Sequence, residues 1–199
     1  MQRPLNPSTE NSVSGYYRST SVSDVCYYYP RPATKDVRVT NRSEQTVEDV
    51  QIRRVKTSEH EATTRVWMRS WESTGLGHSD DLTFGELCEK FEYELAHGWD
   101  LFVAVIDTRI AGMLALRVGE QQLDQLFVDP NFQGSGIGLK LLNFAKQRLP
   151  DGMWLRTAEK NTRAIRFYEA AGFIFVRKQE RPEWDRYDSY FAWTPGAAR

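Results

Sequence analysis

Three glycines alternate with other residues in the stretch DPNFQGSGIGLK, which covers positions 129–140. Gly134, Gly136 and Gly138 have no Cβ atom, so a bulky group can approach the backbone closely at this point. A helix is expected to begin near Ile137, and the free N–H groups and the dipole at a helix start favour an anion. The stretch therefore indicates a phosphate-binding loop in which a pyrophosphate would fit, while a glycine-rich turn without a ligand stays open as the alternative.

Two other glycine-rich phosphate sites fit the stretch less well. A Walker A loop needs a lysine and then a hydroxyl residue directly after its last glycine, whereas Gly138 is followed by Leu139 and only then by Lys140. A dinucleotide fingerprint needs its third glycine at position 139, although Glu159 does stand at the offset of the ribose-binding acid. The sequence excludes the first of these sites and disfavours the second.

Strand and helix signals alternate along the chain on both sides of this stretch. Leu87, Phe91 and Leu95 recur at a spacing of four residues, which predicts an amphipathic helix. Thr83, followed three residues later by Glu86, predicts a capping box at the start of that helix. The strands are expected at 50–55, 100–107, 110–118, 121–128, 153–157, 173–178 and 188–193, and the helices at 58–71, 83–97, 137–149 and 161–171. This order favours a mixed sheet with helices packed on it.

The composition is that of a globular chain. Of the 199 residues, 40% are hydrophobic and 27% are charged, which is enough apolar material for a substantial core. The net charge of −1 gives no overall basic footprint for nucleic acid. The longest apolar run, 101–106, is too short to span a bilayer, and the N-terminal residues carry no apolar signal segment. We therefore expect a cytoplasmic protein that binds neither nucleic acid nor membrane.

The beginning of the chain differs from the rest. Positions 1–45 are rich in Ser, Thr, Asn and Pro, which predicts a flexible tail, and 46–199 would form the folded domain. The segment CYYYPRP at 26–32 is either a loosely packed aromatic patch or, less favoured, a docking segment. Cys26 and Cys88 lie far apart in the chain, and neither they nor the histidines have the spacing of metal ligands, so no metal site is expected.

A second motif follows the glycine-rich stretch. Gln133, Gly136 and Gly138 follow a strand that ends in Val-x-Pro, and one further strand separates them from an asparagine and a helix of the pattern Ala-x-x-Phe-Tyr-x-x-x-Gly-Phe. The residues of this second motif are Asn161, Ala164, Phe167, Tyr168, Gly172 and Phe173. Together the two motifs resemble those of the GNAT superfamily of acetyl-CoA-dependent N-acyltransferases. The order of elements extends the likeness from about Val50 to Trp193.

The resemblance implies a fold and an activity. The fold would be of the mixed α/β (α+β) class: a central, largely antiparallel sheet with one splayed strand pair, flanked by about four helices. The activity would be that of an acyltransferase that moves an acetyl group from acetyl-CoA to a primary amine by direct attack, without a metal. The partner would be a small-molecule or peptide amine acceptor, and the expectation leaves room for a homodimer.

The resemblance also implies which residues bind acetyl-CoA. The loop from Gln133 to Gly138 would bind the pyrophosphate through its N–H groups. The end of the strand before it would pair its backbone with the pantetheine arm, and the side chain of Asn161 would hold that arm. The cofactor-binding residues expected on this basis are Leu126, Phe127, Val128, Gln133, Gly134, Ser135, Gly136, Ile137, Gly138 and Asn161.

Two residues are expected to take part in proton transfer. The resemblance places Tyr168 near the thioester sulfur, where its phenol would protonate the leaving thiolate, with a core aromatic as the simpler alternative. Some family members carry a glutamate that acts as the general base, and this chain has Gln122 at that position. If the strand is regular, alternation puts Glu120, Gln122 and Asp124 on one face. Asp124 is then the best carboxylate to accept the proton of the amine and Glu120 the next, with an orienting or solvated role as the alternative.

The missing glutamate leaves a second function open. Because Gln122 stands in place of an acid, the chain could be a non-catalytic acyl-CoA-binding sensor or interaction module. The resemblance places the acceptor near the first helical region and near the loop at 180–188, for which an ordinary exposed charged hairpin is the preferred interpretation. Candidates in the first of these regions are Trp67, Trp71, His78, Asp80 and Asp81.

Overall fold

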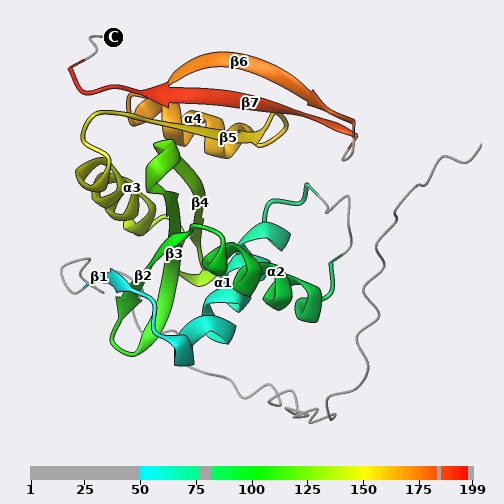
Figure 1. Cartoon of the computed structure of the whole chain (residues 1–199), viewed down its shortest axis with the longest axis vertical. Coiled ribbons are helices and arrows are strands. Elements are labelled where there is room, and N and C mark those ends of the chain that lie inside the picture. Colours follow the sequence, from blue (N-terminus) through cyan, green and yellow to red (C-terminus); the bar gives the residue numbers. More distant parts are fainter. Residues whose placement is uncertain (1–49, 77–81, 183–184, 197–199) are drawn as a thin grey trace, which may run out of the picture. The chain divides into compact units, whose positions relative to one another are not determined.

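The computed structural model describes residues 50–76, 82–182 and 185–196 (Figure 1). These residues have the expected order of elements: a strand, two helices, three strands, a helix, a strand, a helix and two strands. Outside the described residues lie the expected flexible tail at 1–45 and three candidates for the acceptor region, His78, Asp80 and Asp81.

The described strands form one seven-stranded sheet in the order β1-β2-β3-β4-β5-β7-β6. Their bounds are β1 Gln51–Arg54, β2 Asp100–Ile106, β3 Arg109–Arg117, β4 Gln122–Val128, β5 Met153–Ala158, β6 Ile174–Arg181 and β7 Arg186–Trp193. Neighbouring strands run antiparallel at every step of this order except between β4 and β5, which are parallel. The expected mixed, largely antiparallel sheet is confirmed.

The parallel pair β4–β5 is splayed. The two strands pair at one position, where Gln122 lies beside Trp154, and the Trp154 N–H also donates to the carbonyl of Gln121 at 3.0 Å. Beyond that position the described residues of the two strands do not pair. Figure 1 shows β5 lying with β7 and β6 while β4 continues beside β3. The splayed pair is thus confirmed, and it leaves most of β4 with an unpaired backbone on one side.

Four α-helices occur in the described residues, and none of them is long and apolar enough to cross a membrane. Their bounds are α1 His60–Glu72, α2 Phe84–Ala96, α3 Ile137–Arg148 and α4 Thr162–Ala170. Successive strand residues point to opposite faces of the sheet. Leu101 and Met113 therefore pack in one core with residues of α1 and α2, while Phe102 and Leu114 pack in the other with residues of α3 and α4.

Two helix starts are fixed by the caps that the sequence predicts. The Thr83 hydroxyl accepts from the Glu86 N–H at 3.3 Å, and the Glu86 carboxylate accepts from the Thr83 N–H at 2.8 Å, which completes the capping box of α2. Oδ1 of Asn161 accepts from the Ala164 N–H at 3.1 Å and caps α4. Each cap satisfies N–H groups that have no partner inside the helix, so these ends are set locally.

The start of β4 differs from the expectation of a regular strand. Val118–Glu120 forms a short 3-10 turn, and Gln121 after it has a φ of 50°, so the strand begins only at Gln122. The register against β3 then shifts between the pairs that hold Gln125 and Leu123, as in a β-bulge. The prediction that Glu120 shares a strand face with Asp124 is therefore wrong, because the backbone turns between them.

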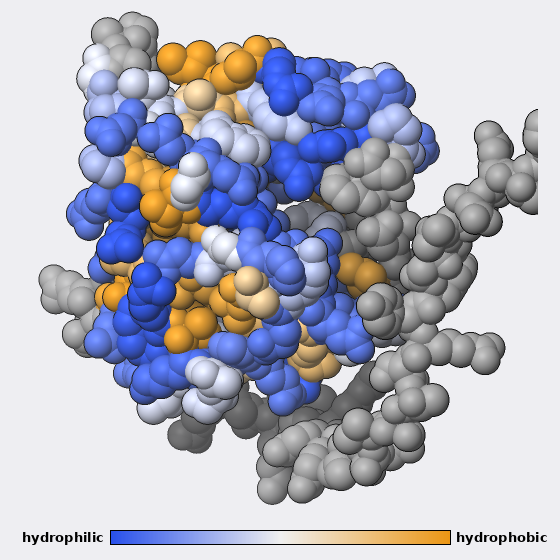
Figure 2. All heavy atoms as spheres, in the orientation of Figure 1, coloured by the Kyte–Doolittle hydropathy of each residue, from blue (hydrophilic) through white to orange (hydrophobic). Residues whose placement is uncertain are grey.

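The edge strand β6 exposes a row of apolar side chains. Ile174, Phe175 and Val176 are 56%, 52% and 57% exposed. Figure 2 shows a hydrophobic patch at the top of the molecule, where Figure 1 places β6. The outer edge of the sheet is thus apolar at the start of β6 and becomes charged from Arg177 onward.

Candidate active site

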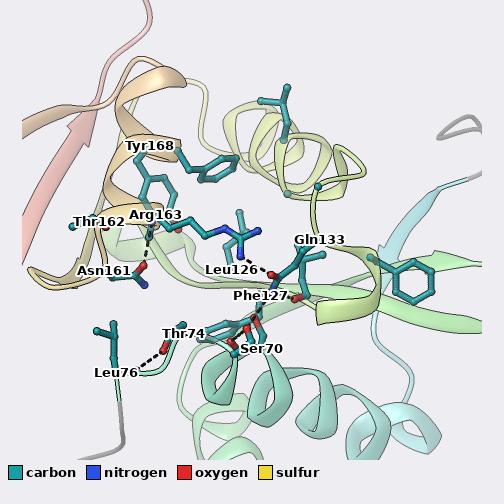
Figure 3. Close-up of a pocket in the computed structure, with 18 of the residues that line it drawn as sticks. Ser70, Thr74, Leu76, Leu126, Phe127, Gln133, Asn161, Thr162, Arg163 and Tyr168 are labelled. Atoms are coloured by element: carbon teal, nitrogen blue, oxygen red, sulfur yellow. Dashed lines mark hydrogen bonds between the residues drawn. The ribbon is translucent and has the colours of Figure 1, made fainter. Parts of the chain in front are cut away.

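A cavity of about 470 Å³ opens beside the C-terminal half of β4, between the glycine loop (residues 133–138) and the start of α4 (Figure 3). Its wall contains many of the residues expected to act on acetyl-CoA, namely Leu126, Phe127, Val128, Gln133, Gly134, Gly136, Gly138, Asn161 and Tyr168. Ser135 and Ile137 are not part of this wall. The Ser135 hydroxyl donates to the Phe132 carbonyl at 2.5 Å and the Ile137 side chain is buried in the core, so both offer a ligand only their backbone.

The glycine loop has the backbone geometry of an anion site. φ is 81° at Gly134 and 84° at Gly136, angles that other residues rarely adopt. Gly136 is the N-cap of α3, and its carbonyl accepts from the Lys140 N–H at 3.1 Å. The N–H groups just before Lys140 therefore lie in the first turn of the helix and have no acceptor within it. Such N–H groups, together with the helix dipole, favour a bound phosphate.

The charges around the cavity also suit an anion. Among the described residues that form the wall, Lys160 and Arg163 are the cations, and no carboxylate is present. Both cations stand close to Asn161, at the end of the cavity formed by α4. A pyrophosphate would therefore meet no repulsion from the described wall.

Gln133 connects three elements at the mouth of the cavity (Figure 3). Its Nε2 donates to the Val128 carbonyl at 3.0 Å, at the end of β4, and to the Ser73 hydroxyl at 3.3 Å, just after α1. Its Oε1 accepts from Nη1 of Arg163 on α4 at 2.7 Å. The first residue of the glycine loop is thus held in place from two sides and bonded to a cation on the third.

Asn161 combines a structural contact with a place in the cavity wall. Its Oδ1 is used by the cap of α4, which fixes the direction of the amide. The Nδ2 group has no hydrogen-bond acceptor among the described residues and remains able to donate to a ligand.

Tyr168 lies on α4 and is almost fully buried. Its ring packs edge-on against Phe167 and Phe173, with centroid distances of 5.2 and 5.5 Å. Desolvation by this burial raises the pKa of the Tyr168 phenol. The hydroxyl makes no hydrogen bond to another described residue, although the side chain forms part of the cavity wall. The phenol is therefore a protonated and unused donor in the cavity.

A second, polar cavity of about 300 Å³ involves the N-terminal half of β4. It is lined by Lys90, Glu94, Trp99, Arg117, Gln122, Asp124, Gln125, Trp154, Arg156 and Arg181, and we call it the polar groove. β4 contributes to both cavities, with Gln125 in the polar groove and Leu126 in the wall of the first cavity. Within the described residues, no three His, Cys, Asp or Glu side chains gather as metal ligands, in the groove or elsewhere.

Asp124 is held firmly in the polar groove. Its Oδ2 accepts from Trp99 Nε1 at 2.6 Å, and Arg117 Nε lies 3.4 Å from the same oxygen. Its Oδ1 accepts from Gln122 Nε2 at 3.0 Å. Gln122, at the position where some family members carry a glutamate, is thus buried and directed at Asp124. The Asp124 carboxylate and the Gln122 amide are therefore hydrogen-bonded to each other where they line the groove.

The C-terminal end of α1 contributes residues that the sequence analysis missed. Ser70, Ser73, Thr74 and Leu76 line the first cavity. The expected candidates in this helix, Trp67 and Trp71, are not in the described wall: Trp67 is a core residue stacked on Phe127, and Trp71 packs against the same core. No motif marks the small polar residues, because their role depends on where α1 ends relative to β4. By contrast, Lys160 and Arg163 stand within two residues of Asn161, so positive charge beside this motif can be recognised in the sequence.

The segment 180–188 also differs from the preferred interpretation of an exposed charged hairpin. Asp188 on β7 is only 1% exposed, and its carboxylate lies 3.0 Å from both Arg156 and Arg186. Arg181 lies 3.5 Å from the same carboxylate and also lines the polar groove. The interpretation is wrong for Asp188, which lies on β7 between β5 and β6 beside arginines of both strands, whereas Glu180, Asp185 and Tyr187 are exposed as expected.

The middle of the chain is similar to known acetyltransferases. The model of the Acetyltransferase (GNAT) family matches residues 61–173, which include β4, the glycine loop and α4. The peptidyl-lysine N-acetyltransferase YjaB of Salmonella typhimurium is 33% identical over 133 residues, covering 66% of this chain and 88% of that protein. A spermine/spermidine N(1)-acetyltransferase of Bacillus subtilis is 37% identical over 62 residues, 29% of this chain and 41% of that protein. The solution structure of apo YjaB from Escherichia coli matches with a TM-score of 0.58 and 27% identity, covering 74% of this chain and 99% of that one.

Proposed function

The chain belongs to the Acetyltransferase (GNAT) family, and from this premise we propose that it transfers the acetyl group of acetyl-CoA to a primary amine by direct attack. The observation that carries the proposal is that the glycine loop, Asn161 and Tyr168 line one cavity beside the unpaired side of β4. The acceptor would be a small-molecule amine or a peptide. Peptidyl-lysine and spermine or spermidine are the acceptors named for two relatives.

The residues of the cavity fit acetyl-CoA. The glycine loop would bind the pyrophosphate with its N–H groups, since Gly134 and Gly136 place no side chain in the way. The unpaired edge of β4 would hydrogen-bond the amides of the pantetheine arm as an added strand does, and Nδ2 of Asn161 would donate to the same arm.

Tyr168 is the proposed general acid. As the amine nitrogen forms its bond to the acyl carbon, the carbon–sulfur bond breaks and the sulfur takes the electron pair together with a proton from Tyr168. The nitrogen becomes positively charged in this step, and its second proton would pass, directly or through water, to the phenolate and restore the Tyr168 hydroxyl. The raised pKa keeps the Tyr168 hydroxyl protonated at neutral pH, and the hydroxyl has no partner among the described residues. The free N–H groups on the unpaired side of β4 would stabilise the negative charge that develops on the carbonyl oxygen.

Asp124 is the proposed acceptor of the proton that the amine must lose. An amine enters as an ammonium ion. The Asp124 carboxylate lies in the polar groove, close in the chain to the point on β4 where Gln125 lines the groove and Leu126 lines the first cavity. The donors Trp99 and Gln122 fix the direction of this carboxylate. The proton would pass to Asp124 directly or through water before the nitrogen attacks.

The proposal is tested by measuring acetyl-CoA binding and CoA thiol release with a panel of amines, lysine peptides and polyamines. Binding of acetyl-CoA together with acceptor-dependent CoA release is expected. Variation of both substrates should give intersecting double-reciprocal lines, because direct attack needs both substrates bound at once. An absence of acetyl-CoA binding by calorimetry would contradict the proposal, and binding without release to any acceptor would favour the sensor alternative.

A further inference from the structure

Arg163 reaches across the cavity in a way that no motif predicts. It lies in the first turn of α4, and its side chain extends to the glycine loop, where Nη1 donates to Oε1 of Gln133 at 2.7 Å (Figure 3). The two residues are 30 positions apart in the chain. An otherwise exposed arginine therefore spans two of the elements that the cavity separates.

The partner of Arg163 is held where a phosphate would lie. Gln133 is the first residue of the glycine loop, and its amide nitrogen is bonded to the Val128 carbonyl and to the Ser73 hydroxyl. These bonds direct Oε1 toward Arg163, so the guanidinium ends beside the side chain of the first residue of the glycine loop. One of the five N–H donors of Arg163 is thus bonded to the neutral amide oxygen of Gln133, at the edge of the anion site.

A pyrophosphate is a better acceptor for this guanidinium than the amide. Hydrogen bonds to an ionised oxygen are shorter and stronger than those to a neutral carbonyl, and a guanidinium can bind two phosphate oxygens in parallel. No carboxylate among the described wall residues competes for Arg163, so an anionic ligand would meet a cation held only by a neutral partner.

We propose that Arg163 is a phosphate-binding residue of the acetyl-CoA site, and that its guanidinium passes from Gln133 to the pyrophosphate as the donor binds. The inference rests on the proposed function and adds to it a residue that neither signature motif specifies. In the structure the Arg163 side chain crosses the cavity between α4 and the glycine loop, so this exchange also clears the way for the pantetheine arm toward Tyr168.

The test compares Arg163→Gln with Arg166→Gln, a matched control. Arg166 is an exposed arginine one turn further along α4 and is not part of the described cavity wall. Calorimetry would measure the Kd of each protein for CoA, for 3′-dephospho-CoA and, by competition, for pantetheine. The three ligands separate the contribution of the pyrophosphate from those of the 3′-phosphate and the arm.

Arg163→Gln should weaken the binding of CoA and of 3′-dephospho-CoA equally, by about tenfold, and should change the Kd for pantetheine by less than about twofold. Arg166→Gln should bind all three ligands as the wild type does. The proposal would be overturned if Arg163→Gln left the Kd for CoA unchanged, if it lowered the affinity for CoA alone, or if it lowered the affinity for pantetheine equally. If the wild type does not bind CoA at all, the proposed function fails first, and the two failures are distinguishable.

Discussion

The indole Nε1 of Trp99 donates a 2.6 Å hydrogen bond to Oδ2 of Asp124, which ties the residue before β2 to the bulged part of β4. The second oxygen of the same carboxylate accepts from Gln122, and Arg117 lies beside the first. A carboxylate with these donors is fixed in direction, which proton transfer to it requires. Gln122 thus stands where some family members carry a glutamate, and the Asp124 carboxylate, fixed in direction, follows two residues later.

Asp124→Asn should reduce kcat/KM by about 100-fold, because an amide cannot accept the proton of the ammonium. The affinity for CoA should stay the same, since Asp124 is not in the wall of the first cavity. The deficit should shrink as the pH rises and more of the acceptor is already a free amine. Glu94→Gln is the control, a second carboxylate that lines the polar groove. Equal deficits in the two variants at all pH values would assign the effect to the charge of the groove.

Tyr168→Phe should lower kcat by about 100-fold and leave the Kd for CoA nearly unchanged, because the ring keeps its packing and only the proton donor is lost. A thioester of a more acidic thiol needs no proton on its leaving group, so its turnover should differ little between the variant and the wild type. A large loss of CoA affinity with unchanged turnover would contradict the role of Tyr168.

The pH profile of the wild type should show no loss of kcat from Tyr168 ionisation between pH 7 and about pH 10. Burial disfavours the phenolate, so the pKa is raised above the ordinary value near 10 and the acid form persists as the pH rises. A decline with a midpoint below pH 9 that disappears in Tyr168→Phe would contradict this expectation.

Gly136→Ala should weaken CoA binding several-fold and lower the free energy of unfolding by about 1–2 kcal/mol, because φ is 84° at this position. Gly119→Ala is the matched control, because Gly119 lines neither cavity, an added Cβ there would meet no atom within 4 Å, and its φ is not in the left-handed region. Urea unfolding and calorimetry on both variants measure the difference. Equal effects would show that loop geometry at Gly136 is not decisive.

Glu59→Gln should destabilise the protein by about 1 kcal/mol at neutral pH, because the carboxylate pairs with Arg53 at 2.7 Å and joins β1 to the start of α1. The bond to Arg53 lowers the pKa of Glu59 to about 2, so its stabilisation is complete above the unfolded value near 4.5 and is lost as the pH falls toward 2. Glu61→Gln, which removes an exposed pair with Arg65, should cost less than about 0.5 kcal/mol. Unfolding midpoints between pH 7 and pH 3 measure both; a pH-independent difference for Glu59→Gln would contradict the assignment.

Local signals predicted much of this fold. Caps at Thr83 and Asn161 and the glycine loop depend on a few neighbouring residues, so they can be recognised in the sequence. The resemblance supplied the splayed pair. The features missed arise from contacts between distant segments. Glu120 leaves the strand because Gln121 turns the backbone, and Asp188 is buried because β5 pairs with β7.

The most direct test of the account follows the acetyl group of isotopically labelled acetyl-CoA by mass spectrometry in mixtures of primary amines and lysine peptides. Labelled N-acetyl product and an equal amount of free CoA are expected, both reduced about 100-fold with Tyr168→Phe. Binding of acetyl-CoA without labelled product above the level found in the absence of enzyme would contradict it.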